Sequence, residues 1–342
     1  MSQIDLFVIG GSAGGLSALL ELVRELPADL PAALCVAIHT APSSPGMLPR
    51  IVAHKTELPC VYAENNQELT PGRIYFAPVD RHLLISGSRM LVTHGPRENG
   101  FRPAVDPLFR SAARSYGPRV AGVILSGSLG DGSYGLAAIK RGGGIAIVQN
   151  PEEALVPSMP LSALRGVDVD HVVNAAEMPQ LLLELADDPK GGPGMAGGAS
   201  HEPPPDPARQ GTELLQDPPT GKITTLTCPE CGGTIWEEED ERQIRFRCHV
   251  GHSYNAESML KYHSQQVESA LWTALRVLEE HASLQQRMAD RARSQQLAAA
   301  AEHFARRSVE SREHAELLRS ALLLPPVAGS VDDLLDAGEP PI

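Results

Sequence analysis

The sequence predicts an α/β fold, a doubly wound and mostly parallel sheet, followed by a small zinc-ribbon-like module and a helical C-terminal segment. Residues 1–186 alternate short, almost continuously apolar runs with helical patterns, which is typical of a parallel sheet covered on both faces. Three clustered cysteines follow, and in a chain without secretion signals such a cluster indicates a metal site before a disulfide. From Asn255 to about Leu324 there is no Gly or Pro, and apolar side chains recur at helical spacing.

Apolar runs and periodicity predict the elements of residues 1–186 in order. The runs IDLFVIG, AALCVAIH, VAGVILSG, GGIAIVQN and VDHVV predict strands. RIYFAP and HLLISGSRMLV suggest a hairpin that turns at Ser86-Gly87-Ser88. Helices are expected after the first glycines, with Leu16, Leu19, Leu20 and Val23 on one face, through Gly135–Lys140, and at 175–185.

Composition divides the chain into five segments. A stretch rich in Pro, Gly and Asp reads as a flexible linker, and the Pro-rich, acidic C-terminus is expected to be disordered. The helical segment is compatible with one long helix or with a helical hairpin. The predicted segments are the α/β domain 1–186, the linker 187–221, the ribbon-like module 222–254, the helices 255–324 and the tail 325–342.

Charge and hydropathy exclude several classes of partner. The formal net charge of −13 argues against nucleic acid, since broad contact with phosphates needs an excess of Lys and Arg. No stretch approaches the roughly 20 apolar residues of a membrane span, and the N-terminus lacks the pattern of a signal peptide. We therefore expect no membrane insertion and a cytoplasmic location.

The turn after the first predicted strand carries a serine among glycines. In VIGGSAGGLSAL, Ser12 stands where the dinucleotide-binding loop G-x-G-x-x-G has its second glycine. Such a fold would also end its second strand in an acidic residue that binds ribose, whereas AALCVAIH ends in His39. Both departures disfavour a flavin or nicotinamide oxidoreductase, and both fit a nucleophile that faces a base.

A third strand end supplies a carboxylate, Asp131 in VILSGSLGDG. The carboxyl ends of parallel strands line the ligand crevice, so Ser12, His39 and Asp131 should meet there as nucleophile, base and orienting carboxylate. Each alone has an ordinary structural interpretation, as a helix cap, a solvated strand end or a turn residue. Their occurrence together at three strand ends favours a catalytic triad.

These blocks resemble the catalytic domain of the CheB-type protein-glutamate methylesterases over roughly residues 4–185. GGSAGG resembles the nucleophile loop of that family, AIHT its histidine strand end and LSGSLGDGSYGL its acidic loop. RPAVDPLFRSAA and IVQNPEEALVPSMPLSAL resemble two further stretches in the same order. The chain order Ser, His, Asp also differs from the Ser, Asp, His order of the α/β-hydrolases.

The resemblance implies hydrolysis of glutamate methyl esters on methylated chemoreceptors in chemotaxis, often with deamidation of particular glutamines, and no cofactor for catalysis. It implies Ser12 as the nucleophile, His39 as general base and acid, and Asp131 as the residue that orients the imidazole. A receiver domain normally precedes this unit in the family. Only a few residues precede the first strand here, so we expect control by something other than phosphorylation in cis.

The same resemblance indicates further site residues. Ala13 and Ser128 are candidates for the oxyanion site, and Arg102 in RPAVDPLF is a candidate contact for an acidic substrate surface, or else an anchor of its own loop. The acidic loop departs from the L-T-G-M-G-x-D-G of better-known members. Ser128 and Leu129 stand where that pattern has Met and Gly.

The cysteine cluster has the spacing of a zinc ribbon. Cys228 and Cys231 form C-x2-C, and after 16 residues Cys248 and His252 form C-x3-H. Four such ligands close a tetrahedral site, which predicts structural rather than catalytic zinc. His249 is the alternative fourth ligand, but similar modules attached to stand-alone methylesterases keep the C-x3-H histidine, which favours His252.

The leading hypothesis is therefore a hydrolase that acts on modified glutamates of a protein. One alternative is a hydrolase of a different modified protein. Another is a signalling adaptor that binds a partner through the ribbon and the helices, for which we expect an unidentified signalling partner. The complete Ser, His and Asp set favours the enzyme, since a scaffold has no need of all three.

Overall fold

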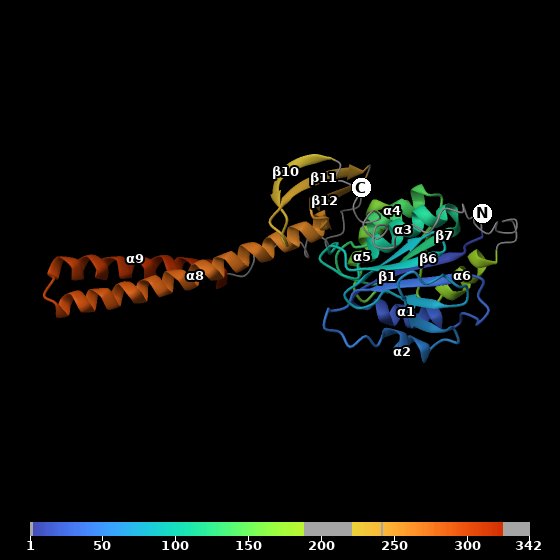
Figure 1. The fold of residues 1–342 in the computed structure, drawn as a ribbon, viewed down its shortest axis with the longest axis horizontal. Helices are drawn as coiled ribbons and strands as arrows, with labels where there is room; N and C mark the ends of the chain where they lie inside the picture. Colours follow the sequence, from blue (N-terminus) through green and yellow to red (C-terminus); the bar gives the residue numbers. More distant parts are fainter. Residues whose placement is uncertain (1–2, 188–220, 241, 324–342) are drawn as a thin grey trace. The chain divides into compact units, whose positions relative to one another are not determined.

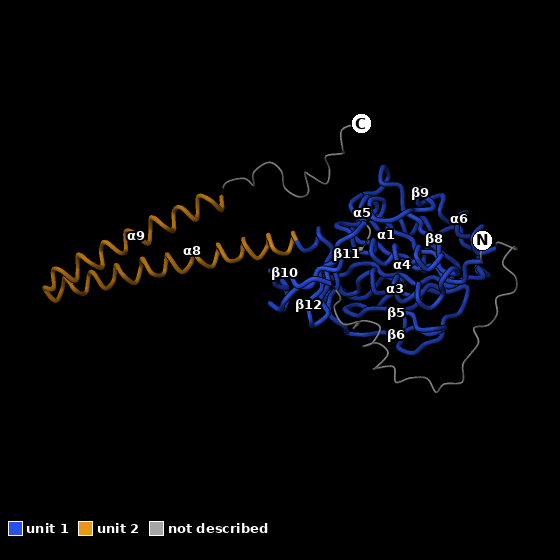
Figure 2. Tube along the Cα trace, turned by 90° about the horizontal axis from the view of Figure 1, so that it is seen from above, with its two compact units in different colours: residues 1–259 blue, residues 260–342 orange. Residues whose placement is uncertain are grey.

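The computed structural model describes residues 3–187, 221–240 and 242–323. It separates into two compact units, Met1–Met259 and Leu260–Ile342, which are coloured separately in Figure 2. Apart from its two end residues, the predicted linker lies outside the described residues, and so does the predicted tail.

A seven-stranded parallel sheet organises the first unit and confirms the predicted fold class (Figure 1). The strand order is β3-β4-β2-β1-β7-β8-β9, and each neighbouring pair is parallel. The strands are β1 Leu6–Gly11, β2 Ala33–Ile38, β3 Cys60–Tyr62, β4 Ile74–Phe76, β7 Val120–Ile124, β8 Ile145–Gln149 and β9 His171–Val173.

A separate antiparallel hairpin consists of β5 His82–Ser86 and β6 Arg89–Thr93. It turns through Gly87 and Ser88, as predicted. The preceding run, expected to belong to this hairpin, instead forms β4 and pairs with β2 and β3 in the parallel sheet. All three residues of β4 are buried, as is usual for an interior strand covered on both faces.

Helices cover both faces of the sheet and create two apolar cores. In β1, Phe7 and Ile9 face the core shared with α1, α2 and α6, whereas Leu6 and Val8 face the core shared with α3, α4 and α5. This two-sided burial explains why the strands read as continuous apolar runs. The helices are α1 Gly15–Val23, α2 Leu48–Ala53, α3 Val105–Tyr116, the 3-10 helix η1 Gly117–Arg119, α4 Ser133–Arg141, α5 Ser158–Gly166 and α6 Met178–Ala186.

A four-stranded antiparallel sheet follows in the same unit, and we call residues 222–255 the ribbon. Its strands, in the order β10-β11-β12-β13, are Lys222–Thr227, Thr234–Asp240, Gln243–Cys248 and Ser253–Asn255. The ribbon contacts the α/β domain: Gln243 Nε2 donates to the carbonyl of Gly166 at 3.1 Å. Just after the ribbon, Arg165 and Glu257 form an ion pair at 2.7 Å.

The second unit is a helical hairpin, which decides between the two arrangements left open by the sequence. Helix α8, Ala256–Ser294, begins in the first unit, and α9, Ala298–Leu323, returns antiparallel to it. Ser308 Oγ donates to the carbonyl of Ala282 at 2.8 Å across the two helices. Among the apolar residues of α8, Leu275 is buried but Val267 is 59% exposed, since the shorter α9 covers only part of α8. No described helix is both long and apolar enough to cross a bilayer.

Candidate active site

Two neighbouring strands place Ser12 and His39 side by side. Ser12 follows the last residue of β1, His39 follows the last residue of β2, and those two residues, Gly11 and Ile38, pair in the sheet. The His39 N–H donates to the carbonyl of Gly11 at 3.0 Å. Ser12 then enters the turn before α1, where Gly14 has φ 79°, a conformation that favours glycine.

Asp131 lies in the loop between β7 and α4 and is fully buried. Its Oδ2 accepts hydrogen bonds from His39 Nε2 at 2.7 Å and from the N–H of Val105 at 2.7 Å. Its Oδ1 accepts from Asn99 Nδ2 at 2.9 Å and from the N–H of Asp106 at 3.2 Å. The carboxylate therefore has four donors around it and no open position.

Burial and hydrogen bonding act in opposite directions on the two buried carboxyls of the site. Burial alone would raise the pKa of Asp131. The hydrogen bond and charge of His39, together with the donated N–H groups, lower it by more than burial raises it, so the pKa lies below its ordinary value. Burial and the adjacent negative charge of Asp131 raise the pKa of Asp106 to about 7. The site thus keeps Asp131 ionised beside a second carboxyl that holds its proton up to neutral pH.

The His39 imidazole is fixed on one side and available on the other. Its ring stacks on Phe101, with ring centroids 3.8 Å apart and an angle of 11° between the planes. Nε2 is engaged by Asp131, whereas Nδ1 is buried without a hydrogen-bond partner in the described part of the chain. Nδ1 is therefore the nitrogen left to exchange a proton with Ser12, a contact that often tightens only when substrate binds.

The acidic loop packs closely against the serine. A methyl group at Gly127 would lie 2.1 Å from Met159 Sδ, 2.8 Å from Ser12 Cβ and 3.0 Å from the Ser12 backbone nitrogen, so only glycine fits there. Leu129, which stands where the family pattern has glycine, has φ 64°, the left-handed conformation that favours glycine. The loop thus keeps a glycine-like backbone although its residue is leucine. Ser128 lies between these two residues and is partly buried.

Two of the predicted substrate-binding residues have definite contacts. Ala13 is exposed beside Ser12, and its carbonyl accepts a hydrogen bond from Ser126 Oγ at 2.7 Å. Arg102 lines the site, but its guanidinium also binds Asp80 at 2.8 Å and the carbonyl of Gly95 at 2.9 Å. It therefore anchors its own loop, one of the two roles considered for it, and its role toward substrate stays a prediction.

A cavity of about 310 Å³ opens over Ser12 and His39 and is also lined by Arg97, Phe101 and Arg102, among others. Arg97 has no ion-pair partner among the residues that the structure describes, so its charge is available in this cavity. Neither Arg97 nor Phe101 was expected from the sequence. The Asn-Gly pair between them, a frequent tight-turn signal, was the feature that could have indicated a hairpin here.

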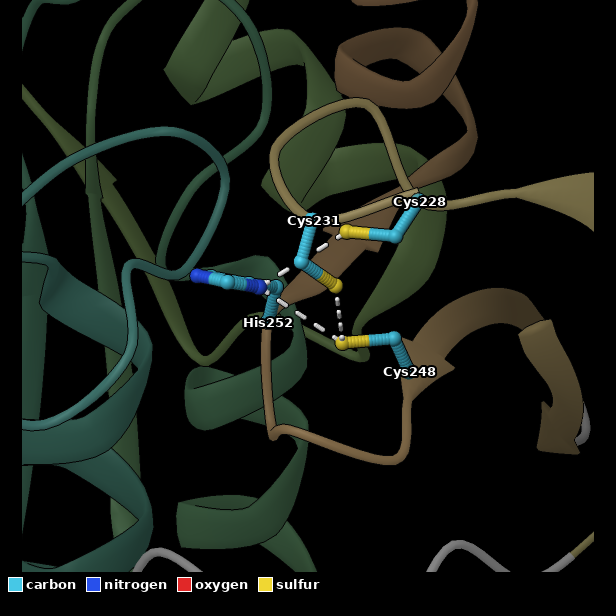
Figure 3. Close-up of side chains that lie close together, drawn as sticks. All are labelled: Cys228, Cys231, Cys248 and His252. Carbon is cyan, nitrogen blue, oxygen red and sulfur yellow. Dashed lines mark hydrogen bonds between the residues drawn. The ribbon is translucent and has the colours of Figure 1, made fainter. Parts of the chain in front are cut away.

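The four predicted metal ligands converge, as Figure 3 shows. Cys228 follows β10, Cys248 ends β12, and His252 precedes β13, while Cys231 lies in the turn after β10. His252 Nδ1 lies 3.7 Å from Cys228 Sγ and 3.6 Å from Cys248 Sγ, and the Sγ atoms of Cys231 and Cys248 are 3.7 Å apart.

These separations suit a tetrahedral ion. Zinc bonds of about 2.3 Å to sulfur and about 2.0 Å to nitrogen place tetrahedral ligand atoms roughly 3.5–3.8 Å apart. On its far side, His252 Nε2 lies 3.2 Å from a carboxylate oxygen of Glu230, an outer partner of the kind that orients metal-binding histidines. His252, and not His249, is therefore the histidine brought to the three cysteines.

A serine beside an imidazole that binds a buried carboxylate, at the carboxyl edge of a parallel sheet, is the arrangement of a serine hydrolase. The comparisons with known proteins agree. The family model described as CheB methylesterase matches residues 7–182, so the chain belongs to the CheB methylesterase family. The matched residues end before the ribbon.

Relatives and a solved structure cover the same part. A protein of Leptospira interrogans, whose name assigns it as a protein-glutamate methylesterase/protein-glutamine glutaminase, is 35% identical over 182 residues, 53% of this chain and 94% of the relative. Protein-glutamate methylesterase/protein-glutamine glutaminase 2 of Anaeromyxobacter dehalogenans is 37% identical over 184 residues, 54% of each chain, so this chain spans about half of that relative. The crystal structure of the Thermotoga maritima CheB methylesterase catalytic domain matches with a TM-score of 0.51 and 32% identity, over 54% of this chain and 99% of that one.

Proposed function

We propose that this protein is a serine hydrolase that removes methyl esters from glutamate side chains of chemoreceptors, and that it also hydrolyses particular glutamine amides. The observation that carries the proposal is that Ser12 and His39 line one cavity while His39 is hydrogen-bonded to the buried Asp131. The names of the relatives support both activities. The substrate segment would be a cytoplasmic part of the receptor, and the enzyme would act in the cytoplasm.

The reaction would proceed through a covalent intermediate. Ser12 Oγ attacks the ester carbonyl while its proton passes to His39, and the resulting imidazolium is stabilised by Asp131. The bond to the methoxy group then breaks, and His39 returns the proton so that methanol leaves. Water attacks the glutamyl ester on Ser12 with His39 again as base, which releases glutamate and restores the serine. For a glutamine side chain the leaving group is ammonia.

Developing charge on the carbonyl oxygen needs donors near Ser12. We assign this role to the backbone N–H groups of Ala13 and Ser128. Ala13 follows the nucleophile directly in the turn before α1, and the acidic loop that contains Ser128 packs on the side chain of Ser12. The left-handed backbone at Leu129 would orient the loop for this purpose. No cofactor is needed for these steps.

The charge lining the cavity suits an acidic protein surface. Arg97 and Arg102 both line it, and the charge of Arg102 is shared with Asp80. We assign recognition of carboxylates near the methylated glutamate chiefly to Arg97, with Arg102 as a second contact. Arg97→Ala should raise KM for a methylated receptor fragment and leave hydrolysis of a small neutral ester unchanged.

We also propose that Cys228, Cys231, Cys248 and His252 hold one structural zinc ion. The support is the ligand spacing and the donor set, because soft thiolates with one imidazole select zinc. Four protein ligands leave no position for a catalytic water, so this metal would contribute to folding and not to the chemistry at Ser12.

Mass spectrometry of a methylated receptor fragment tests the substrate. Incubation with the protein should convert methylated glutamate positions to glutamate, and His39→Ala should abolish the conversion as the matched control. An adaptor would bind the fragment and leave its methyl esters intact. That result would overturn the proposed function.

A further inference from the structure

The edge strand of the ribbon pairs with the segment that carries the active-site aromatic ring. The N–H of Asn99 donates to the carbonyl of Ser253 in β13 at 2.7 Å, and the N–H of Ser253 donates to the carbonyl of Arg97 at 3.4 Å. The bridge between Glu98 and Ser253 is parallel. The ribbon sheet is therefore extended by a piece of the α/β domain, through main-chain hydrogen bonds.

That piece is a short hairpin. Glu98 and Phe101 exchange backbone hydrogen bonds of 3.2 and 2.9 Å, and the two residues between them, Asn99 and Gly100, have φ of 52° and 80°. Two successive positive φ values are the mark of the tightest hairpin turn, for which Asn-Gly is the preferred sequence. What holds Asn99 in place thus also holds Phe101 against the ring of His39.

The Asn99 side chain joins the ribbon to the triad. Its Oδ1 accepts a hydrogen bond from the backbone N–H of Asn255 at 2.8 Å. Its Nδ2 donates to Asp131 at 2.9 Å and to Asp106 at 3.0 Å. An amide has one acceptor oxygen and two N–H donors, so each is used, and the residue is only 2% exposed. The ribbon N–H fixes which end of the amide faces the catalytic carboxylate.

A buried charge cluster fastens the same contact. The carboxylate of Glu98 accepts two hydrogen bonds from Arg110, at 2.7 and 2.9 Å, and one from Ser253 Oγ at 3.0 Å. Arg245 of β12 lies 3.3 Å from it and also stacks on the ring of Tyr134. Removing the ribbon would leave Glu98 with one cation and would open the hairpin to water.

We propose that the ribbon is a positioning element of the catalytic triad, with Asn99 as the positioning residue through which it acts on Asp131. The inference rests on the proposed function of the triad. The metal site enters because His252 immediately precedes β13 and its carbonyl accepts the N–H of Cys248 at 2.9 Å. Loss of metal should therefore release β13, the hairpin and the orientation of Asp131 together.

A matched pair of variants isolates the connecting hydrogen bond. Asn255→Pro removes the N–H that binds Asn99, and Asn255→Ala keeps that N–H while removing the side chain that caps α8 through Ser258. We expect Asn255→Pro to lower kcat for ester hydrolysis about 10- to 100-fold at unchanged KM, as is usual when a supporting residue is lost. Asn255→Ala should stay close to wild type.

Two readouts need no substrate and therefore separate this inference from the proposed function. The low-field proton resonance of the hydrogen bond between His39 and Asp131 should broaden or vanish in Asn255→Pro and persist in Asn255→Ala. Hydrogen exchange of the peptide spanning residues 97–102 should accelerate in wild type when zinc is removed by a chelator, while exchange in β1 stays slow. If ester hydrolysis is absent but both readouts respond, only the proposed function fails.

The inference is overturned by either of two results. One is an unchanged low-field resonance in Asn255→Pro that is folded and still binds zinc. The other is that residues 97–102 of the wild type remain equally protected from hydrogen exchange after the metal has been removed. This second measurement uses the wild type and therefore tests the inference even if Asn255→Pro does not fold.

Discussion

The substitution Asp131→Asn tests the catalytic role proposed for this carboxylate while nearly preserving the shape of the side chain. In the wild type, each carboxylate oxygen accepts two hydrogen bonds: His39 and the N–H of Val105 bind one oxygen, and Asn99 and the N–H of Asp106 bind the other. An asparagine must present an NH2 group to one of these pairs. Whichever orientation it takes, at least one backbone donor faces another donor.

The expected losses follow from that mismatch. A buried donor left without an acceptor costs about 1–3 kcal/mol, so one or two of them should lower the free energy of unfolding by roughly 1–6 kcal/mol. For catalysis, the neutral amide neither stabilises the imidazolium nor selects the tautomer of His39, and the corresponding change in serine hydrolases lowers kcat about 10⁴-fold. The neighbouring Asp106, freed from the charge of Asp131, should titrate below its wild-type pKa of about 7.

Three measurements check this. Urea unfolding at about pH 6, where Asp106 is protonated in the wild type, gives the stability change. Initial rates of methanol release, scaled to folded protein, give the change in kcat, and NMR titration of the labelled carboxyl carbons gives the pKa of Asp106. If Asp131→Asn retained activity within about tenfold of wild type, the assignment of Asp131 to the triad would be refuted.

Three further changes have definite expected outcomes. Purified protein should contain about one zinc per chain by elemental analysis, and Cys228→Ser with Cys231→Ser should lose it; metal-free folded wild type would contradict the site. Gly127→Ala should lower kcat about 100-fold, because the added Cβ would clash with Ser12 and displace it. An unchanged kcat would contradict this prediction and show that the loop moves to accommodate the methyl group. Burial alone would raise the pKa of Glu98, but Arg110 and Arg245 lower it well below the ordinary value of 4.5. The ionised Glu98 therefore stabilises the fold above about pH 4.5, and this stabilisation is lost as the pH falls towards the lowered pKa. Glu98→Gln should therefore flatten the acid side of the stability profile, and an unaltered profile would contradict that.

Much of the site could be predicted because the sheet itself determines it. Parallel strands with buried faces read as apolar runs, and the residue after each run lies at the same edge of the sheet. Ser12 and His39 follow β1 and β2 directly, so their proximity follows from strand order alone. Asp131 lies several residues beyond the end of β7, in the loop before α4, so the strand end predicted the edge of the sheet at which it lies but not its contacts.

The supporting residues could not be predicted in the same way. Asn99 is far from Asp131 in the chain and reaches it only because a tight turn points its amide at the carboxylate. Asp106 appeared within a recognised block, but nothing in its sequence shows that it lies beside another buried carboxyl. Such contacts depend on the packing of loops, which has no periodic signal in a sequence.

The association of the ribbon with the α/β domain is a third case. The cysteine spacing predicted a ribbon-like module, and the structure forms an antiparallel β11–β12 hairpin between the two pairs of predicted ligands. The partners of the ribbon could not be recognised, because Glu98 and Arg245 belong to residue types that usually lie on the surface, yet Glu98 is buried and Arg245 pairs with it. A linker with no hydrophobic pattern between the two gives no hint of that contact.

The most direct test of the catalytic assignment is the rate of methanol release from a methylated receptor fragment by the wild type and by Ser12→Ala. If Ser12 is the nucleophile, the wild type releases methanol and Ser12→Ala, folded and with the same metal content as the wild type, is slower by about 10⁴-fold or more. Equal rates for the two proteins would contradict the account.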